Sequence, residues 1–86
     1  MARRAVGLSL STVLTYQDGD EHGWDTEFAY LRAEHSDRLA ALRADILKNG
    51  IREPVVIGPD GRVWDGHHRI CIADELGMST IPVRFA

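Results

Sequence analysis

The stretch VVIGPDGRVWDGHHRICIADELG, residues 55–77, contains the signals of a hairpin followed by a helix. Val55–Ile57 is a continuous apolar run, typical of a strand that is buried on both faces. Gly58–Gly61 (GPDG) is a strong turn signal, because proline presets one φ angle and glycine can adopt a positive one. These signals predict a hairpin whose second strand is Arg62–Trp64.

A helix is predicted directly after Asp65 and Gly66. It runs from His67 to Leu76, and Gly77 is placed to end it. The apolar side chains expected on its buried face are Ile70, Ile72, Ala73 and Leu76.

The rest of the chain completes a small sheet backed by helices. Val6–Leu14 is predicted to be an edge strand, Asp25–Glu34 a helix, and Ile81–Phe85 the last strand. A further helix is predicted from an N-cap at Ser36 to Gly50. Its apolar positions are Leu39, Leu42, Ile46 and Leu47. This order predicts a single α/β (α+β) domain over residues 1–86, with a mixed sheet of about four strands.

Composition predicts a globular protein of the cytoplasm. Of the 86 residues, 44% are apolar and 27% charged, and no apolar run approaches the roughly 20 residues of a membrane-spanning helix. Met1–Leu14 is too interrupted by small polar residues to be a signal peptide. Cys71 is the only cysteine, so no intrachain disulfide forms and a reducing compartment is expected. No membrane partner is expected.

The net charge of −3 disfavours DNA binding by the chain alone. Non-specific DNA binding depends on lysine and arginine contacts to phosphates, whereas residues 18–27 carry five acidic side chains. We interpret that segment as a solvated acidic loop. A DNA role would need a local basic face or a partner.

The turn at Gly66 predicts an anion site. It places His67, His68 and Arg69 in the first turn of a helix, where backbone N–H groups lack intrahelical partners and the helix dipole is positive. Arg69 can add a bidentate contact to a phosphate. Zinc is disfavoured, since adjacent histidines on a helix point about 100° apart and the chain has no cysteine pair to complete a site.

Asp65 has two interpretations that remain open. A carboxylate about 4 Å from a phosphate is repelled by about 4 kcal/mol at an effective dielectric constant near 20. Asp65 therefore either turns away to cap the helix or reaches the phosphates through Mg²⁺.

Four nearby side chains are predicted to have structural roles only. Trp64 is expected in the core and Cys71 as a small packing residue. His35 is expected at a solvated helix end and His22 in an exposed loop.

The residues from Leu39 to Val83 resemble the ParB-like nuclease domain of the ParB/sulfiredoxin superfamily. The resemblance rests on LAALRADILKNGIREPVVI, a short turn, and GRVWDGHHRICIADELGMSTIPV. It implies a compact α/β domain in which Gly66, His67, His68 and Arg69 bind nucleotide phosphates. The implied ligands are ATP, ADP or CTP with Mg²⁺.

The branches of this superfamily differ at the turn. Sulfiredoxins carry a reactive cysteine where this chain has His67, which disfavours that reaction. Chromosome-partition ParB proteins continue into a helix-turn-helix domain that reads DNA, and this module is not expected in a chain ending at Ala86. Free-serine kinases of the fold carry a similar DGHHR, which implies Asp65 as a Mg²⁺ ligand and a glutamate as the base, either Glu34 or Glu53.

The leading hypothesis is a nucleotide-binding ParB-like domain that acts in DNA transactions of a phage or plasmid. One alternative is a Mg²⁺-dependent phosphotransferase or nuclease with Asp65 and Glu34 as catalytic residues. Another is a non-catalytic module that contacts a host or partner protein. Homodimerisation is compatible with so small a core.

Overall fold

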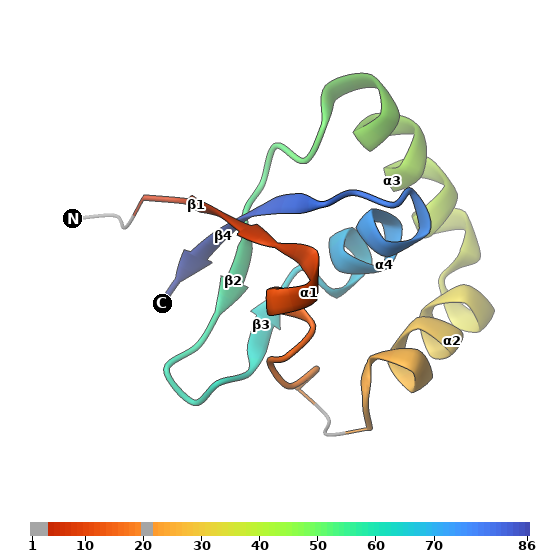
Figure 1. The fold of residues 1–86 in the computed structure, drawn as a ribbon. Helices are drawn as coiled ribbons and strands as arrows, with labels where there is room; N and C mark the ends of the chain where they lie inside the picture. Colours follow the sequence, from red (N-terminus) through yellow and green to blue (C-terminus); the bar gives the residue numbers. More distant parts are fainter. Residues whose placement is uncertain (1–3, 20–21) are drawn as a thin grey trace.

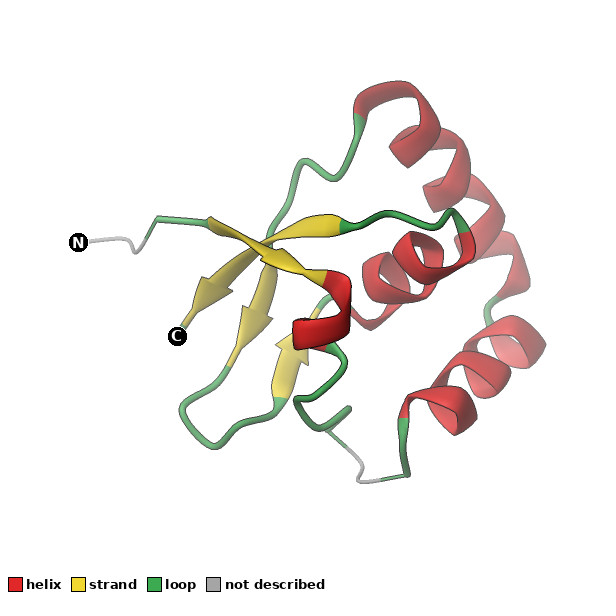
Figure 2. Ribbon diagram, viewed as in Figure 1, coloured by secondary structure: helices red, strands yellow, loops and turns green. Residues whose placement is uncertain are grey.

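The computed structural model describes residues 4–19 and 22–86, which form a four-stranded mixed sheet with three longer helices gathered on one side of it (Figure 1, Figure 2). In chain order the elements are β1 (Val6–Ser9), α1 (Leu10–Val13), α2 (Trp24–Glu34), α3 (Ser36–Asn49), β2 (Val55–Ile57), β3 (Val63–Asp65), α4 (His67–Glu75) and β4 (Thr80–Phe85). The predicted α+β class and the mixed sheet are confirmed.

The sheet has the strand order β1-β4-β2-β3. β1 pairs antiparallel with β4, β4 pairs parallel with β2, and β2 pairs antiparallel with β3. The predicted hairpin is therefore present, and β1 is an edge strand as expected. The parallel pairing of β2 with β4 requires a crossover, which α4 supplies.

α4 lies at the centre of the fold, in contact with α1, α2, α3 and β2. Its residues Ile70–Ala73 are all at most 1% exposed, so the helix is covered on several sides. This burial confirms Cys71 as a packing residue, and it raises the pKa of the Cys71 thiol. On the outer surface Arg43 of α3 donates through Nε to Glu75 Oε2 of α4 at 2.7 Å.

Beyond one-residue shifts at the ends of α2, β3, α4 and β4, two predicted element ends differ from the structure. The strand predicted over Val6–Leu14 ends at Ser9, whose Oγ accepts a hydrogen bond from the Thr12 backbone N–H at 3.2 Å and caps the short helix α1. The Ser36 N-cap is also wrong, since His35 alone separates α2 from α3 and makes no side-chain capping bond. A break of one residue leaves no room for a serine cap before α3.

Three burial predictions are wrong. Leu47 is 68% exposed, because α3 packs through Leu39 and Ile46 and turns Leu47 outward. Trp64 is 55% exposed, since Val63 points into the core and the indole lies across Gly58 on the outside of the hairpin. Asp18, expected in a solvated loop, is 2% exposed.

Backbone hydrogen bonds hold the chain next to Asp18 against the β2–β3 hairpin. Gln17 donates to the Gly61 carbonyl at 3.0 Å and accepts from Val63 N at 2.9 Å. Other parts of the acidic segment do lie at the surface, since His22 and Asp25 are exposed as predicted. Residues 20 and 21 of that segment lie outside the described part of the chain.

Within residues 4–19 and 22–86, no helix combines the length and the apolar character that crossing a membrane requires.

Candidate functional site

The turn from β3 into α4 requires glycine at position 66. Gly66 has φ 111°, and a Cβ there would lie 2.8 Å from Val55 Cγ2 and 3.2 Å from Val55 Cα. The Gly66 carbonyl accepts from Ile70 N at 2.9 Å, which starts the helical hydrogen bonding. The first turn of α4 is therefore held directly against β2.

A hollow of about 340 Å³ opens beside this turn. One wall is the turn itself and the other is the N-terminal half of α3. It is lined by Asp65, Gly66, His68 and Arg69 from the turn and by Arg38, Ala41 and Leu42 from α3. The structure thus brings four of the predicted site residues together and adds a second arginine.

Arg69 is the most firmly held side chain of the site. Its Nη1 donates to the carbonyls of Glu53 at 2.8 Å and Pro54 at 3.0 Å, and its Nη2 lies 3.1 Å from Asp65 Oδ2. The side chain is 16% exposed. The guanidinium is therefore fixed in direction, and Asp65 covers one of its edges.

Asp65 does not cap α4. Gly66 is the N-cap residue and the cap has no side-chain hydrogen bond, so the capping interpretation is wrong. Instead the Asp65 carboxylate, with a side chain 69% exposed, makes the ion pair with Arg69. Its predicted role as a Mg²⁺ ligand remains a prediction.

No group of three or more His, Cys, Asp or Glu side chains among the described residues could hold a metal ion. Mg²⁺ is usually bound by one or two carboxylates together with phosphate oxygens and water. A single exposed carboxylate at the edge of the hollow suits a Mg²⁺ ion that arrives with a nucleotide, and it does not suit a metal site made by the protein alone.

His68 is hydrogen-bonded to His35, a contact that the sequence did not predict. His35 Nδ1 and His68 Nε2 are 2.8 Å apart. The pKa of His68 is lowered, first by burial and then by the positive charge of Arg38 and the neighbouring His35, His67 and Arg69. His68 is therefore neutral at pH 7 and acts as a hydrogen-bonding group rather than as a cation.

His67 is turned away from the other predicted phosphate contacts. Its ring lies 5.6 Å from the Trp24 ring, and a Cβ on Gly19 would come 3.6 Å from its Nε2. That Nε2 atom is buried and has no hydrogen-bond partner among the described residues. The divergence follows from the roughly 100° step between adjacent helical residues.

The two glutamates considered as a base line neighbouring hollows. Glu34 lies with His35 and Arg38 at a hollow of about 270 Å³. Glu53 lies with Arg69 at one of about 560 Å³ between the C-terminal half of α3 and the segment before β2. Leu42 and Arg69 also line the hollow at Gly66, so the larger hollow adjoins it.

His35 and Arg38 are the site residues that sequence reasoning missed. Arg38, Ala41 and Leu42 have the i, i+3, i+4 spacing that places side chains on one face of a helix. That spacing was a usable signal for a shared wall. His35 had no comparable signal, because its contact with His68 joins residues that are 33 positions apart.

Comparison with known proteins adds one relative. The chain is similar to a protein of Acidianus two-tailed virus described as "Uncharacterized protein ORF326b", with 39% identity over 61 residues. The match covers 69% of this chain and 18% of the viral protein, so the chain spans less than a fifth of that relative's length. No family model matches the chain. No solved structure matches it either.

Proposed function

We propose that this protein is a ParB-like domain that binds a nucleotide, ATP, ADP or CTP, through the hollow at Gly66. The observation that carries the proposal is the meeting of three features in one hollow: the first turn of α4, Arg69 and Arg38. The helix start supplies backbone donors and a positive dipole end, and the two arginines supply positive charge. Together these groups favour a phosphate.

The size of the two adjoining hollows supports a nucleotide rather than a lone phosphate. Ligand sites in proteins commonly have volumes of about 300–1,000 Å³. The hollow at Gly66 measures about 340 Å³ and its neighbour about 560 Å³, and they share Leu42 and Arg69. When the phosphates are bound at the helix start, the neighbouring hollow is available for the sugar and the base.

The Asp65–Arg69 ion pair makes binding dependent on Mg²⁺. A phosphate that approaches Arg69 meets the carboxylate of Asp65, which lies 3.1 Å from the same guanidinium. A Mg²⁺ ion carried by the nucleotide would bind Asp65, remove the repulsion and free that edge of Arg69. Asp65 is thus proposed as the protein ligand of a nucleotide-bound Mg²⁺.

The viral relative is consistent with a role in a mobile element. A DNA transaction of a phage or plasmid is the setting that we propose, with a partner supplying any sequence recognition. The acidic balance of the chain supports the need for that partner.

Calorimetry with ATP, ADP and CTP in the presence of Mg²⁺ tests the proposal. We expect Arg69→Ala to weaken binding by more than about tenfold, because a charge-assisted contact is lost. Because Arg69→Ala also removes the hydrogen bonds to two backbone carbonyls, Arg38→Ala is the second variant. Arg84→Ala, on β4, is the matched control. Absence of binding by the native protein, or equal losses in Arg38→Ala and Arg84→Ala, would refute the site.

Asp65→Asn separates the role of Mg²⁺ from that of the arginines. Without Mg²⁺ the variant should bind nucleotide severalfold more tightly than the native protein, since the repelling charge is gone. Mg²⁺ should increase the nucleotide affinity of the native protein, whereas it should not increase that of Asp65→Asn. The same Mg²⁺ dependence in both proteins would remove Asp65 from the proposal.

A further inference from the structure

We propose that His35 and His68 form a single proton-accepting unit of this site, and that the unit takes up one proton when a phosphate group enters the hollow. The inference rests on the proposed function and deepens it, because it adds His35 to the site as a positioning residue and makes the protonation state of the site part of binding.

The two imidazoles meet edge to edge in one plane. Their nitrogens are 2.8 Å apart, their ring centroids 5.0 Å, and their planes differ by 4°. The centroid separation exceeds the nitrogen separation by about the two ring radii, so the rings are not stacked face to face. This is the arrangement of a linear N–H···N hydrogen bond.

Such a pair can accept one proton without breaking its hydrogen bond. In the neutral pair one ring donates and the other accepts, and either ring can take either role. One added proton converts the contact into a charge-assisted hydrogen bond, which is stronger. A second proton would leave two donors facing each other, so the pair holds one positive charge and not two.

The groups around the pair decide when that proton binds. Arg38 of α3 and Arg69 and His67 of α4 act on His68 through their charge. Asp65, with which Arg69 is paired, lies at the end of β3 and lines the same hollow as His68. On the other side the Tyr30 ring of α2 contacts His35 edge-on, and Glu34 lines the hollow next to it.

A bound phosphate reverses the balance of charge at His68. Burial and positive neighbours lower the pKa of His68 in the free protein, whereas a phosphate beside Arg38 and Arg69 adds negative charge that raises it. Because binding and protonation are linked reciprocally, a rise in the pKa of His68 on binding means tighter binding at lower pH. A rise of one unit corresponds to a tenfold change in affinity.

The test is calorimetry with MgATP and, separately, with MgCTP, in buffers of different ionisation enthalpy. Between about pH 8 and about pH 6, on either side of the ordinary histidine pKa, we expect the native protein to bind about tenfold more tightly at the lower pH. Near neutral pH it should take up a proton on binding. The double variant His35→Gln/His68→Gln should lose both effects while the nucleotide's own titration stays unchanged, and His22→Gln, in an exposed loop, should behave as the native protein does.

NMR of the histidine ring nitrogens measures the pKa of His68 in the native protein, so this test needs no variant. Sulfate keeps its double negative charge across this pH range, so a rise in the pKa of His68 on adding sulfate reports the anion alone. Nucleotide binding with no proton uptake, together with an unshifted His68, would overturn this inference and leave the proposed function standing. Absence of nucleotide binding at every pH would remove both.

Discussion

At the scale of single residues, the turn at position 66 requires glycine for two independent reasons. The φ angle of 111° is strained for any other residue, and a Cβ would come 2.8 Å from Val55 Cγ2. Gly77, at the end of α4, has φ 68° and open space around the position of a Cβ. A substitution at Gly77 therefore introduces backbone strain alone, whereas one at Gly66 introduces both strain and a steric conflict with Val55.

Gly66→Ala should lower the free energy of unfolding by about 2–4 kcal/mol, whereas Gly77→Ala should lower it by about 1 kcal/mol. Urea denaturation of both variants measures the difference. Equal losses would mean that the approach of β2 to the turn does not restrict residue 66.

The sequence predicted much of the site at this scale, because Asp65, Gly66, His68 and Arg69 are close neighbours in the chain. It did not predict the Asp65–Arg69 ion pair or the contact of His68 with His35. Each of these depends on where a side chain points once the helices have packed. Spacing along one helix cannot supply that information.

At the scale of elements, α4 was predicted almost to the residue and is the central helix of the core. Its apolar side chains were expected on one stripe, yet four consecutive residues are buried because α1, α2, α3 and β2 all contact it. α3 shows the reverse, since Leu47 fitted the apolar spacing but lies outside the packed face. The spacing of apolar residues predicts which face of a helix is buried. The elements that pack against the helix determine how many of its residues are buried.

Ile72→Ala should destabilise the protein by about 2–5 kcal/mol, because Ile72 is 0% exposed and the cavity left would be closed on all sides. Leu47→Ala is the control and should change stability by less than about 0.5 kcal/mol. Chemical denaturation compares the two. A large loss for Leu47→Ala would place its side chain in the core after all.

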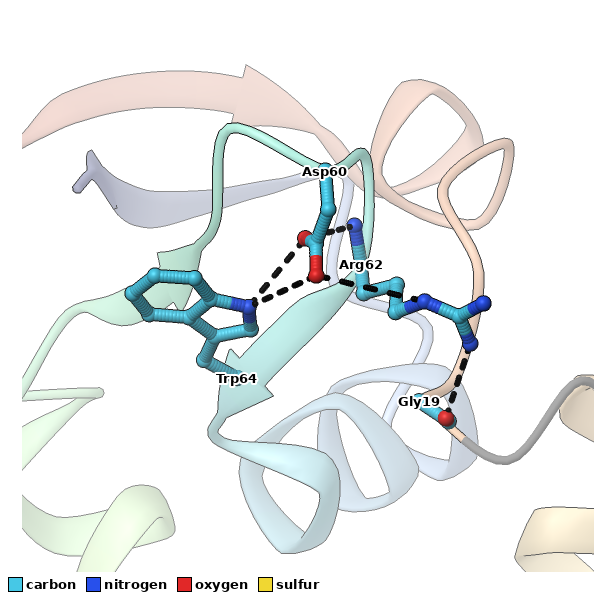
Figure 3. A network of polar contacts seen from close by, with 4 residues as sticks. All are labelled: Gly19, Asp60, Arg62 and Trp64. Carbon is cyan, nitrogen blue, oxygen red and sulfur yellow. Dashed lines mark hydrogen bonds and ion pairs between the residues drawn. The ribbon is translucent and has the colours of Figure 1, made fainter.

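The β2–β3 hairpin fixes Trp64 on its outer surface. The Trp64 indole N–H donates to Asp60 at 3.1 and 3.3 Å, the Asp60 carboxylate also accepts from Arg62 N, and Arg62 Nη1 donates to the Gly19 carbonyl (Figure 3). These bonds link the turn between β2 and β3, strand β3 itself and the loop before α2. Trp64 was predicted to lie in the core, because tryptophan side chains are highly buried on average.

Gly58→Ala should displace the Trp64 indole, since a Cβ at position 58 would lie 2.1 Å from Trp64 Cε2. The exposed ring can swing away, so the expected result is a red-shifted tryptophan emission with a stability loss of no more than about 1 kcal/mol. The same substitution in a Trp64→Phe background isolates the Trp24 signal. An unchanged emission would contradict the placement of the indole over Gly58.

At the scale of the whole molecule, His68 links stability to pH. Its pKa is lowered in the folded state, so below about pH 6.5 the unfolded chain binds more protons than the folded one. Stability is then lost as the pH falls through the ordinary histidine pKa toward the lower pKa of the folded state.

Native protein and His68→Gln, compared by urea denaturation from about pH 8 to about pH 5, should therefore differ in slope. The native protein should lose stability more steeply below about pH 6.5, while glutamine keeps a hydrogen-bonding group toward His35 without titrating. Parallel curves would show that burial of His68 does not affect its protonation.

An amide NMR titration with MgATP and MgCTP tests whether the hollow at Gly66 binds a nucleotide, on which the proposed function depends. We predict saturable shifts at residues 66–69 and at Arg38, extending to Leu42 and Ile51 of the neighbouring hollow, with little change in β1. No saturable shifts, or shifts confined to the loop before α2, would contradict the claim.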